Sequence, residues 1–314
     1  IDSLKLEDAI RLIDERKTIN DWFDTSTKMP NLNLVTVVGH NITMLPHMLE
    51  YYQQFVEEKN IFIVVYRQHE NDGILEQIEE LGITPYKVVT EPKFHWEKVT
   101  ELYNEVKMTK PYDWWIVSDD DEIQIYPKPI DEMIDECEIA GWEFITGGFL
   151  DRIGDGGTFP SVDSNTNIWE SFPYAGFFRY PLSGACPNKV CIMKGKIKIT
   201  NGQHYAHIDG KDVWGEEEAH HPLRYPPGRG EGFIQVHHFK WDSTVLERLK
   251  EVSETEEDYT FWEEYKKMYK AIEVFDWKID ITNPMFGLVR NIPIQNEHWD
   301  YQYWNRLTKG ILKI

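Results

Sequence analysis

The sequence predicts an α/β protein with a mixed, mostly parallel central sheet flanked by helices and a C-terminal helical extension. Short apolar runs rich in β-branched and aromatic residues alternate with segments of helical spacing in the first half of the chain. This alternation of strand and helix is the pattern of a parallel sheet. A chain of 314 residues, 41% of them hydrophobic and 14% aromatic, can also bury a large core.

The elements of the first half follow in order from the N-terminus. Residues 1–30 form a separate segment, in which residues 4–24 have the spacing of an amphipathic helix. The continuous β-branched run at 34–38 is typical of a buried parallel strand. The elements that follow are strands at 31–39, 61–66, 85–89 and 114–117, and helices at 43–58, 74–81 and 95–108.

The second half of the chain has a different pattern. Residues 141–240 combine Gly, Pro and aromatic residues with short strand-like runs, which predicts a partly antiparallel region with long loops. These runs lie at 144–149, 189–193, 197–200 and 233–239. From residue 244 to about residue 272 the chain is charged and helical. We therefore divide the chain into the N-terminal helix, a main domain over 31–250 and a helical extension over 251–314.

The charge of the chain limits its partners. The formal net charge is −21 at pH 7. Such an acidic surface repels nucleic acid and anionic membranes, so we expect neither as the main partner. A nucleotide ligand would need a local cation, such as a metal ion, a helix N-terminus or a few basic side chains.

The apolar runs and the cysteines indicate in which cellular compartment the protein is expected. No run approaches the ~18 apolar residues of a membrane span. Cys137, Cys186 and Cys191 have no zinc-ligand spacing, and we expect reduced, mostly buried thiols. Pairing of Cys186 with Cys191 is the alternative for a secreted chain. We therefore expect a soluble cytoplasmic protein without a transmembrane segment.

An acidic run, consisting of Asp119, Asp120, Asp121 and Glu122, directly follows the fourth predicted strand. Adjacent carboxylates at the end of a buried strand are costly unless a cation joins them. Mg²⁺ and Mn²⁺ prefer oxygen ligands and are often held by one or two carboxylates plus substrate phosphates. On an extended chain Asp119 and Asp121 point to the same side, with Asp120 turned away. The competing interpretation is a solvated turn.

Polar residues also follow the first two strands. Ligands of parallel α/β sheets bind beyond the carboxyl ends of the strands. His40 and Asn41 follow the first strand, and Asn71 and Asp72 follow the second. We assign them to the base and ribose of a nucleotide, with simple turn chemistry as the alternative at Asn71 and Asp72.

Together these motifs resemble the GT-A glycosyltransferases, and most closely the family-2-like branch with an Asp-x-Asp-Glu motif. The resemblance covers roughly residues 32–250. Besides the acidic run it rests on later segments at 148–152 with 155–156, 189–195, 202–205 and 236–241. The chain departs from the family pattern after the first strand, where no Glu accompanies Asn41.

The resemblance implies a Rossmann-like GT-A fold and a metal-dependent glycosyltransferase. Such an enzyme transfers a sugar from a UDP- or GDP-sugar to a glycan or other hydroxyl acceptor, with Mn²⁺ or Mg²⁺ as cofactor. Carried over to this chain, Asp121 binds the metal, while Asp119 contacts the ribose or a metal-bound water and completes the metal site. Glu122 is expected to support the loop.

In many GT-A enzymes a C-terminal histidine is a third metal ligand. His237 and His238 end a strand-like run, and adjacent strand residues face opposite ways. We favour His238 over His237, with a structural hydrogen-bonding role as the alternative. Lys240 is then on the same side as His238, where it can neutralise a diphosphate.

An inverting transferase needs a carboxylate to accept the proton of the attacking hydroxyl. Asp151, after the strand at 144–149, is the first candidate, and pairing with Arg152 is its alternative. Glu217, in the run 216–218, is the second. Arg179, Lys189 and Lys194 are candidate phosphate contacts, with a surface charge as the alternative for each.

Two other function classes compete with a glycosyltransferase. A sugar-phosphate nucleotidyltransferase shares the α/β sheet and the acidic pair. That class usually has a basic Gly-rich loop after the first strand, and residues 38–41 contain no Lys or Arg. A carbohydrate-binding module would use the 12 Trp and 16 Tyr to stack on sugars, but it does not require buried parallel strands or the acidic run.

Overall fold

The structure, a computed structural model, describes residues 31–39, 41–176, 188–213, 234–254, 262–280 and 290–291. The helix predicted at 4–24 lies outside these residues. So do three candidate site residues, His40, Arg179 and Glu217.

The first half of the described chain forms the parallel part of a large sheet. The strands are ordered β3-β2-β1-β4, and each neighbouring pair is parallel, as predicted. The strands are β1 (Leu32–Val38), β2 (Ile61–Arg67), β3 (Lys87–Thr90) and β4 (Trp114–Val117). The helices between them are α3 (Leu45–Tyr52), α4 (Ile74–Glu80) and α5 (Trp96–Lys107). The helix predicted at 43–58 ends earlier, and the 3-10 turn η1 (Glu58–Asn60) follows it.

Strands from the second half extend the same sheet beyond β4. Their order is β13-β7-β6-β8-β4, with antiparallel pairing throughout. One further strand, β12, pairs in parallel with β6 and antiparallel with β5. These strands are β5 (Glu122–Ile125), β6 (Phe144–Ile153), β7 (Tyr174–Gly176), β8 (Asn188–Lys194), β12 (Ile234–His238) and β13 (Arg290–Asn291). The predicted mixed α/β sheet is therefore confirmed.

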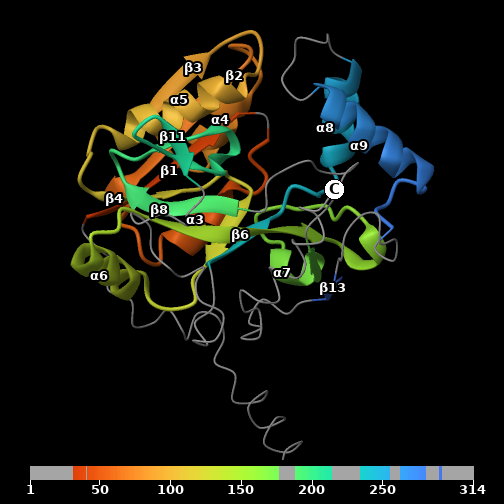
Figure 1. The fold of residues 1–314 in the computed structure, drawn as a ribbon. Coiled ribbons are helices and arrows are strands. Elements are labelled where there is room, and N and C mark those ends of the chain that lie inside the picture. The colour runs from red at the N-terminus through yellow and green to blue at the C-terminus, as the bar shows by residue number, and fades with distance from the viewer. Residues whose placement is uncertain are drawn as a thin grey trace, which may run out of the picture.

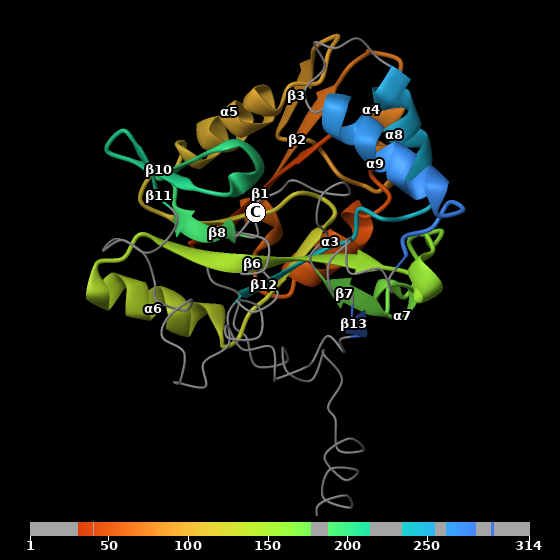
Figure 2. The same ribbon diagram turned by 45° about the vertical axis from the view of Figure 1, so that its right-hand side comes forward.

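Two apolar layers cover the sheet. Along β1 the side chains alternate, so Leu34 packs into the core beneath α3, α4 and α6 (Ile130–Ala140), whereas Val35 packs beneath α5. The α5 layer also includes Ile199 and Ala206 from a small antiparallel sheet. Figures 1 and 2 show α5 and this small sheet on one face, and α3 and α6 on the other. The small sheet consists of β9 (Lys198–Ile199), β10 (Ala206–Ile208) and β11 (Lys211–Val213).

Two helices, α8 (Val245–Glu254) and α9 (Trp262–Val274), lie where one helical stretch at 244–272 was predicted, and α8 crosses the predicted boundary between the main domain and the extension. The two helices lie side by side in both ribbon views (Figures 1 and 2). They share an apolar cluster with Ile153 of β6, with Trp241 and with Ile279. The extension is thus joined to the main sheet by a core of its own.

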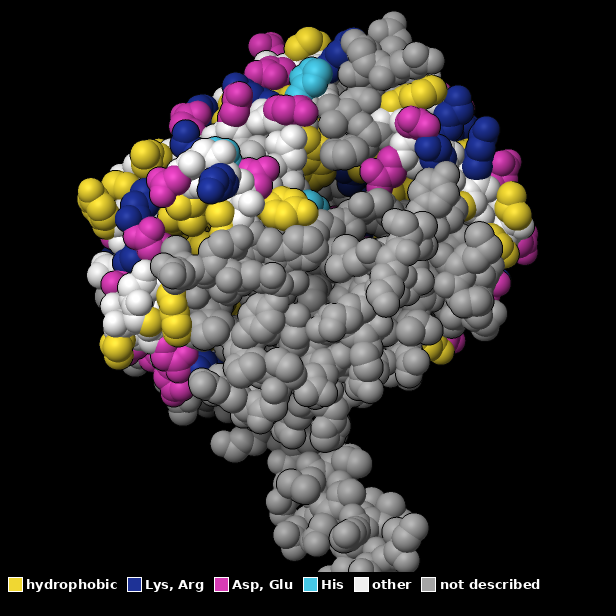
Figure 3. Space-filling view, in the orientation of Figure 1, with side chains coloured by type: hydrophobic (Ala, Val, Ile, Leu, Met, Phe, Trp, Pro, Cys, Tyr) yellow, Lys and Arg dark blue, Asp and Glu magenta, His cyan; other side chains and the backbone are white. Residues whose placement is uncertain are grey.

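The surface of the described chain is mixed in charge. Figure 3 shows acidic and basic side chains interspersed over the described part of one face. None of the helices formed by the described residues combines the length and apolar character needed to span a bilayer. Cys137 and Cys191 are buried free thiols, as predicted, and Cys186 lies outside the described residues.

The strand order reverses direction between β1 and β4. The chain moves outward from β1 to β2 and β3, and then returns to add β4 on the other side of β1. Ligands of open α/β sheets bind at the carboxyl ends of the strands at such a reversal. At the end of β1, a Cβ on Gly39 would lie 2.3 Å from the Tyr66 carbonyl oxygen, so only glycine fits this approach. The acidic run follows β4 at the same reversal.

Candidate active site

The acidic run forms a turn between β4 and β5. Glu122 N donates to the Asp119 carbonyl oxygen at 3.1 Å, and residues 120–121 are the turn. The expected extended conformation, with Asp119 and Asp121 facing one side, is therefore wrong. The reason lies in the topology, because β4 pairs with β1 and β8 whereas β5 has to diverge to pair with β12. Asp119 and Asp121 consequently have different surroundings.

Asp119 is held by three donors from separate parts of the chain. Its Oδ1 accepts hydrogen bonds from the Tyr103 hydroxyl at 2.8 Å and from Gln203 Nε2 at 2.9 Å. Its Oδ2 lies 3.4 Å from Lys189 Nζ. The side chain keeps 18% of its surface exposed, so it can still contact a ligand. Tyr103 comes from α5, Gln203 from the 3-10 turn η3 (Asn201–Gln203) and Lys189 from β8.

Glu122 and Lys189 form a buried ion pair directly behind the acidic turn. The Glu122 Oε1 to Lys189 Nζ distance is 2.6 Å, and their side chains are 1% and 5% exposed. Burial lowers the pKa of Lys189, but Glu122 and Asp119 outweigh it and raise that pKa above its usual value. The alternative of a surface charge at Lys189 is thus wrong. The expected supporting role of Glu122 agrees with its burial.

His238 lies between two carboxylates. Its Nε2 is 3.4 Å from Asp121 Oδ2, and its Nδ1 is 2.9 Å from Asp151 Oδ1. The same Asp151 oxygen accepts a hydrogen bond from Trp241 Nε1 at 2.9 Å. This arrangement follows from strand register, because His238 is opposite Asp151 on β6 and opposite Glu122 on β5. Burial lowers the pKa of His238, but Asp121 and then Asp151 outweigh burial and raise it to about 10.

The neighbouring histidine has a different environment. The side chain of His237 is fully buried, its Nε2 is 3.0 Å from Gln235 Oε1, and its ring meets Trp169 edge to face. Burial also lowers its pKa well below the usual value. His237 is therefore part of the core, and only His238 of this pair faces the acidic run.

Asp151 does not have the surroundings expected of an accessible base. Its side chain is only 3% exposed and orients His238 through the contact with Nδ1. A ligand histidine commonly donates its second ring N–H to a carboxylate, which fixes the ring orientation. The geometry thus supports a positioning role for Asp151. Arg152, its expected alternative partner, lies over the ring of Trp169 with its Cζ 5.7 Å from the ring centroid.

The candidate nucleotide contacts have local structural roles. Asn41 Oδ1 accepts from Thr43 N at 2.9 Å, and its Nδ2 donates to Thr244 Oγ1 at 2.9 Å. Asp72 Oδ1 accepts from Ile74 N at 3.1 Å at the start of α4. Asn71 precedes it as an exposed residue of the same turn. These contacts favour the turn interpretation at residues 71–72, and they tie the end of β1 to the segment before α8.

Two basic residues shortly before the C-terminal extension contribute positive charge to the site. Burial raises the pKa of Asp121, but His238 and then Arg248 and Lys240 outweigh burial and lower it to about 2. Lys240 Nζ lies 4.9 Å from the ring centroid of Tyr265, and Arg248 Nη2 donates to the Tyr265 hydroxyl at 3.3 Å. Lys240 was expected near His238, but the contribution of Arg248 was not predicted. One arginine in a charged helix carries no distinguishing sequence signal.

Burial also shifts the pKa of Asp120, which lies between Asp119 and Asp121 in the run. The pKa of Asp120 is raised well above its usual value by burial and by the neighbouring Asp121 and Asp119. Several carboxylates that disfavour one another's charge create the electrostatic condition for a bound cation.

A metal fits the donor atoms only in part. Within the described ranges, no group of three or more His, Cys, Asp or Glu side chains is arranged to hold a metal ion. The expected set of Asp119, Asp121 and His238 is therefore not assembled, because Asp119 is held toward Tyr103 and Gln203. Asp121 Oδ2 and His238 Nε2 do face each other at 3.4 Å. The carboxylate oxygen suits Mn²⁺ or Mg²⁺, and the imidazole can join it as a ligand once Nε2 has lost its proton. A cation held by these two atoms would take its other ligands from phosphate and water.

Comparisons with known proteins do not assign a family. No protein-family model matches the chain, and no curated protein matches it. Among solved structures, S. aureus TarS aligns at a TM-score of 0.30 and 11% identity, over 76% of this chain and 43% of that chain. A structure of TarS 1–349 aligns at a TM-score of 0.30 and 11% identity, over 80% of this chain and 74% of that chain. The chain thus spans less than half of the longer TarS chain.

A protein described as a glucose-1-phosphate thymidylyltransferase from Bacillus anthracis, in complex with a sucrose, also aligns. Its TM-score is 0.29 at 12% identity, over 52% of this chain and 72% of that chain. TM-scores this low support no argument about the function of this chain.

Proposed function

We propose that the protein is a metal-dependent glycosyltransferase that transfers a sugar from a UDP- or GDP-sugar to a hydroxyl of a carbohydrate acceptor. The observation that carries the proposal is the contact between Asp121 and His238. Strand pairing brings these residues to 3.4 Å of each other, and Asp151 orients the imidazole from behind. The contact lies at the reversal of strand order, where α/β sheets bind their ligands.

The residues of the site have distinct roles in this proposal. Asp121 and His238 hold Mn²⁺ or Mg²⁺, which when bound offsets the charge of the departing diphosphate. Asp119, held by Tyr103 and Gln203, presents its exposed surface to the ribose. Lys240 is the candidate contact to the diphosphate. Each of these side chains is positioned by packing or hydrogen bonds before a ligand arrives, which lowers the cost of ordering them.

The segment after β1 favours sugar transfer over nucleotidyl transfer. Nucleotidyltransferases of this architecture use basic side chains there to bind the triphosphate, and residues 38–41 have none. A carbohydrate-binding module would gain nothing from burying the Glu122–Lys189 pair behind a cluster of carboxylates. Both classes are distinguishable by product analysis.

The test combines binding and turnover. Thermal unfolding is measured with and without MnCl₂ and UDP or GDP, and hydrolysis of UDP- and GDP-sugars is followed with Mn²⁺. Asp121→Ala and His238→Ala are compared with Asp135→Ala and His69→Ala, which remove exposed residues of the same types. We expect manganese to raise the unfolding temperature and support hydrolysis in the wild type and in both controls, and to do neither in the two site variants.

Three results would contradict the proposal. One is full hydrolysis by Asp121→Ala. Another is the absence of any manganese effect on wild-type unfolding and turnover. The third is release of pyrophosphate from a nucleoside triphosphate with a sugar 1-phosphate, which would identify a nucleotidyltransferase.

A further inference from the structure

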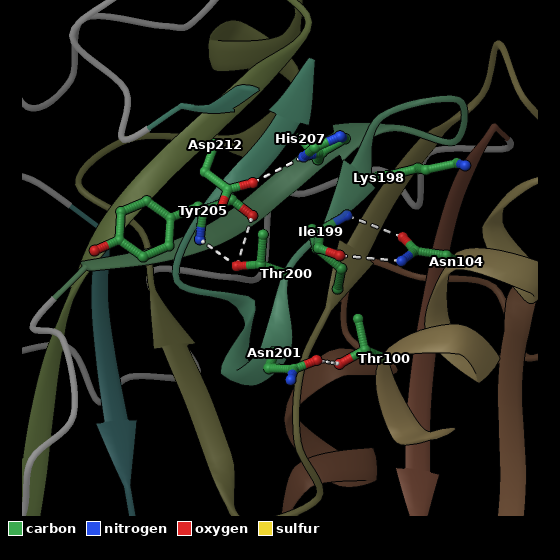
Figure 4. Close-up of a pocket in the computed structure, with 9 residues that line it drawn as sticks. All are labelled: Thr100, Asn104, Lys198, Ile199, Thr200, Asn201, Tyr205, His207 and Asp212. Atoms are coloured by element: carbon green, nitrogen blue, oxygen red, sulfur yellow. Dashed lines mark hydrogen bonds and ion pairs between the residues drawn. The ribbon is translucent and has the colours of Figure 1, made fainter. Parts of the chain in front are cut away.

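A pocket with both polar and apolar groups in its lining lies outside the acidic run, between α5 and the small sheet. Its volume is about 490 Å³, within the roughly 300–1,000 Å³ of small-molecule sites. Figure 4 shows Tyr205 at one side, His207 with Asp212 above, and Asn201 with Thr100 below. The lining residues are Thr100, Asn104, Lys198, Ile199, Thr200, Asn201, Tyr205, His207 and Asp212.

Hydrogen bonds fix the wall of this pocket. Asn104 Nδ2 donates to the Ile199 carbonyl oxygen at 3.0 Å, and Ile199 N donates back to Asn104 Oδ1 at 2.9 Å. Thr100 Oγ1 donates to Asn201 Oδ1 at 2.9 Å. Helix α5 is thereby joined to β9 of the small sheet and to the turn η3 that follows it. A ligand entering the pocket would meet a wall that is already ordered.

The polar groups of the pocket suit hydroxyls better than a charged ligand. His207 Nδ1 lies 2.8 Å from Asp212 Oδ1, and both side chains are partly exposed, at 43% and 57%. The lining contains one lysine, Lys198, and one carboxylate, so its formal charge sums to zero with neutral histidine. Imidazole, amide and carboxylate groups together offer donors and acceptors, as a hydroxyl does. The half-buried Tyr205 adds an aromatic ring on which a sugar can pack.

We propose that this pocket binds a neutral sugar unit of a glycan. The Tyr205 ring packs against the sugar, and the His207–Asp212 pair with Asn201 bonds its hydroxyls. The pocket is separate from the acidic run, yet Gln203, two residues after Asn201, donates to Asp119 at 2.9 Å. The pocket is therefore linked to the acidic run through η3, which contains both Asn201 and Gln203. The binding itself does not depend on the proposed transfer reaction.

The test measures binding alone. Maltose, cellobiose and N,N′-diacetylchitobiose are titrated into the full chain by calorimetry and by saturation-transfer NMR. The buffer contains EDTA and no nucleotide, so that the outcome is independent of any metal-dependent turnover. Inorganic phosphate is the anionic probe. We expect saturable binding of at least one disaccharide and none of phosphate.

Variants then locate the binding. Tyr205→Ala should weaken it about tenfold, the scale of one lost aromatic contact. His207→Ala, at a partly exposed side chain, should weaken it without disturbing the fold, which thermal unfolding checks. The matched control is Tyr112→Ala, which removes a tyrosine that is 76% exposed elsewhere, and it should bind like the wild type. The proposal is overturned if no disaccharide binds, if phosphate binds instead, or if both pocket variants bind like the wild type.

Discussion

Lys107 is a lysine without surface exposure, in the layer between α5 and the sheet. Its Nζ donates to the Ile197 carbonyl oxygen and lies 3.2 Å from Met193 Sδ. Burial lowers the pKa of Lys107 from 10.5 to about 7. Between these values the unfolded chain binds more protons than the folded chain does. The contribution of this group to the free energy of unfolding therefore rises with pH across that window. Below about pH 7 the folded chain holds Lys107 charged and buried, which lowers its stability.

Lys107→Met tests this linkage, because it removes the titrating amine and keeps a chain of similar length. We expect the variant to lose part of the rise in unfolding free energy that the wild type shows between about pH 7 and about pH 9. Urea unfolding at several pH values measures it. Lys250→Met, at an exposed position, should keep the wild-type slope. Equal slopes in Lys107→Met and the wild type would show that Lys107 takes up no proton on unfolding in this pH window.

Gln203 adopts a backbone conformation that is unfavourable for a residue with a side chain. Its φ is 61°, and the side chain is buried with its amide on Asp119. A left-handed conformation costs an L-residue roughly 1–2 kcal/mol, which glycine avoids. Gln203→Gly should therefore be more stable than Gln203→Ala by about 1 kcal/mol, as measured by urea unfolding. An alanine variant as stable as the glycine variant would show that the backbone relaxes there.

At the residue scale the sequence singled out Asp121 and His238, which the structure brings into contact, but not the residues that hold Asp119. Asp121 was singled out because an acidic run followed a buried strand. His238 was singled out because the resembled family has a C-terminal histidine ligand and because adjacent strand residues face opposite ways. Tyr103 and Gln203 gave no such signal. Tyr103 occupies the buried stripe of its helix like any core aromatic, and its bond to Asp119 depends on tertiary packing.

At the scale of single elements, α8 connects the extension to the site. Leu249 on its buried face is fully buried in the cluster that contains Trp241, and Trp241 donates to Asp151. Leu249→Ala should lower the free energy of unfolding by about 2–4 kcal/mol, through lost burial and the cavity left behind. Leu81→Ala, at a leucine that is 41% exposed, is the control and should have a smaller effect. Equal effects in urea unfolding would show that α8 packs loosely.

Element prediction succeeded where periodicity was strong. The parallel strands and their helices followed from apolar runs and helical spacing. Helix α6 carried the same signal, since Ile130, Met133, Ile134 and Cys137 are buried on one face, yet sequence analysis did not recognise it. Strand β5 was hidden because the acidic run was interpreted as an extended metal-binding segment, although Ile123 and Ile125 alternate behind it. A competing interpretation therefore obscured a period-two pattern.

At the scale of the whole molecule, the net charge of −21 opposes compactness through self-repulsion. Salt screens charges beyond about 10 Å at 0.1 M ionic strength. Raising NaCl from low to physiological concentration should therefore raise the unfolding temperature by a few degrees, as measured by circular dichroism. KCl should act equally if screening is the cause. A fall in the unfolding temperature would show that attractive ion pairs outweigh the repulsion.

The arrangement of the complete sheet was only partly predictable. The order β3-β2-β1-β4 follows from short alternating connections, but β12 inserts between β5 and β6 from a distant part of the chain. Nothing local in residues 234–238 specifies these partners. The position of His238 beside Asp121 could therefore be proposed from the sequence only through the family resemblance.

The insertion of β12 sets the order in which the site can form during synthesis. On the ribosome, β4, the acidic turn and β6 emerge well before residue 238. Until then the nascent chain leaves the edges of β5 and β6 without this partner, and Asp151 without its imidazole. The carboxylates of the site are thus made first, and the nitrogen that completes them arrives only when residue 238 has been translated.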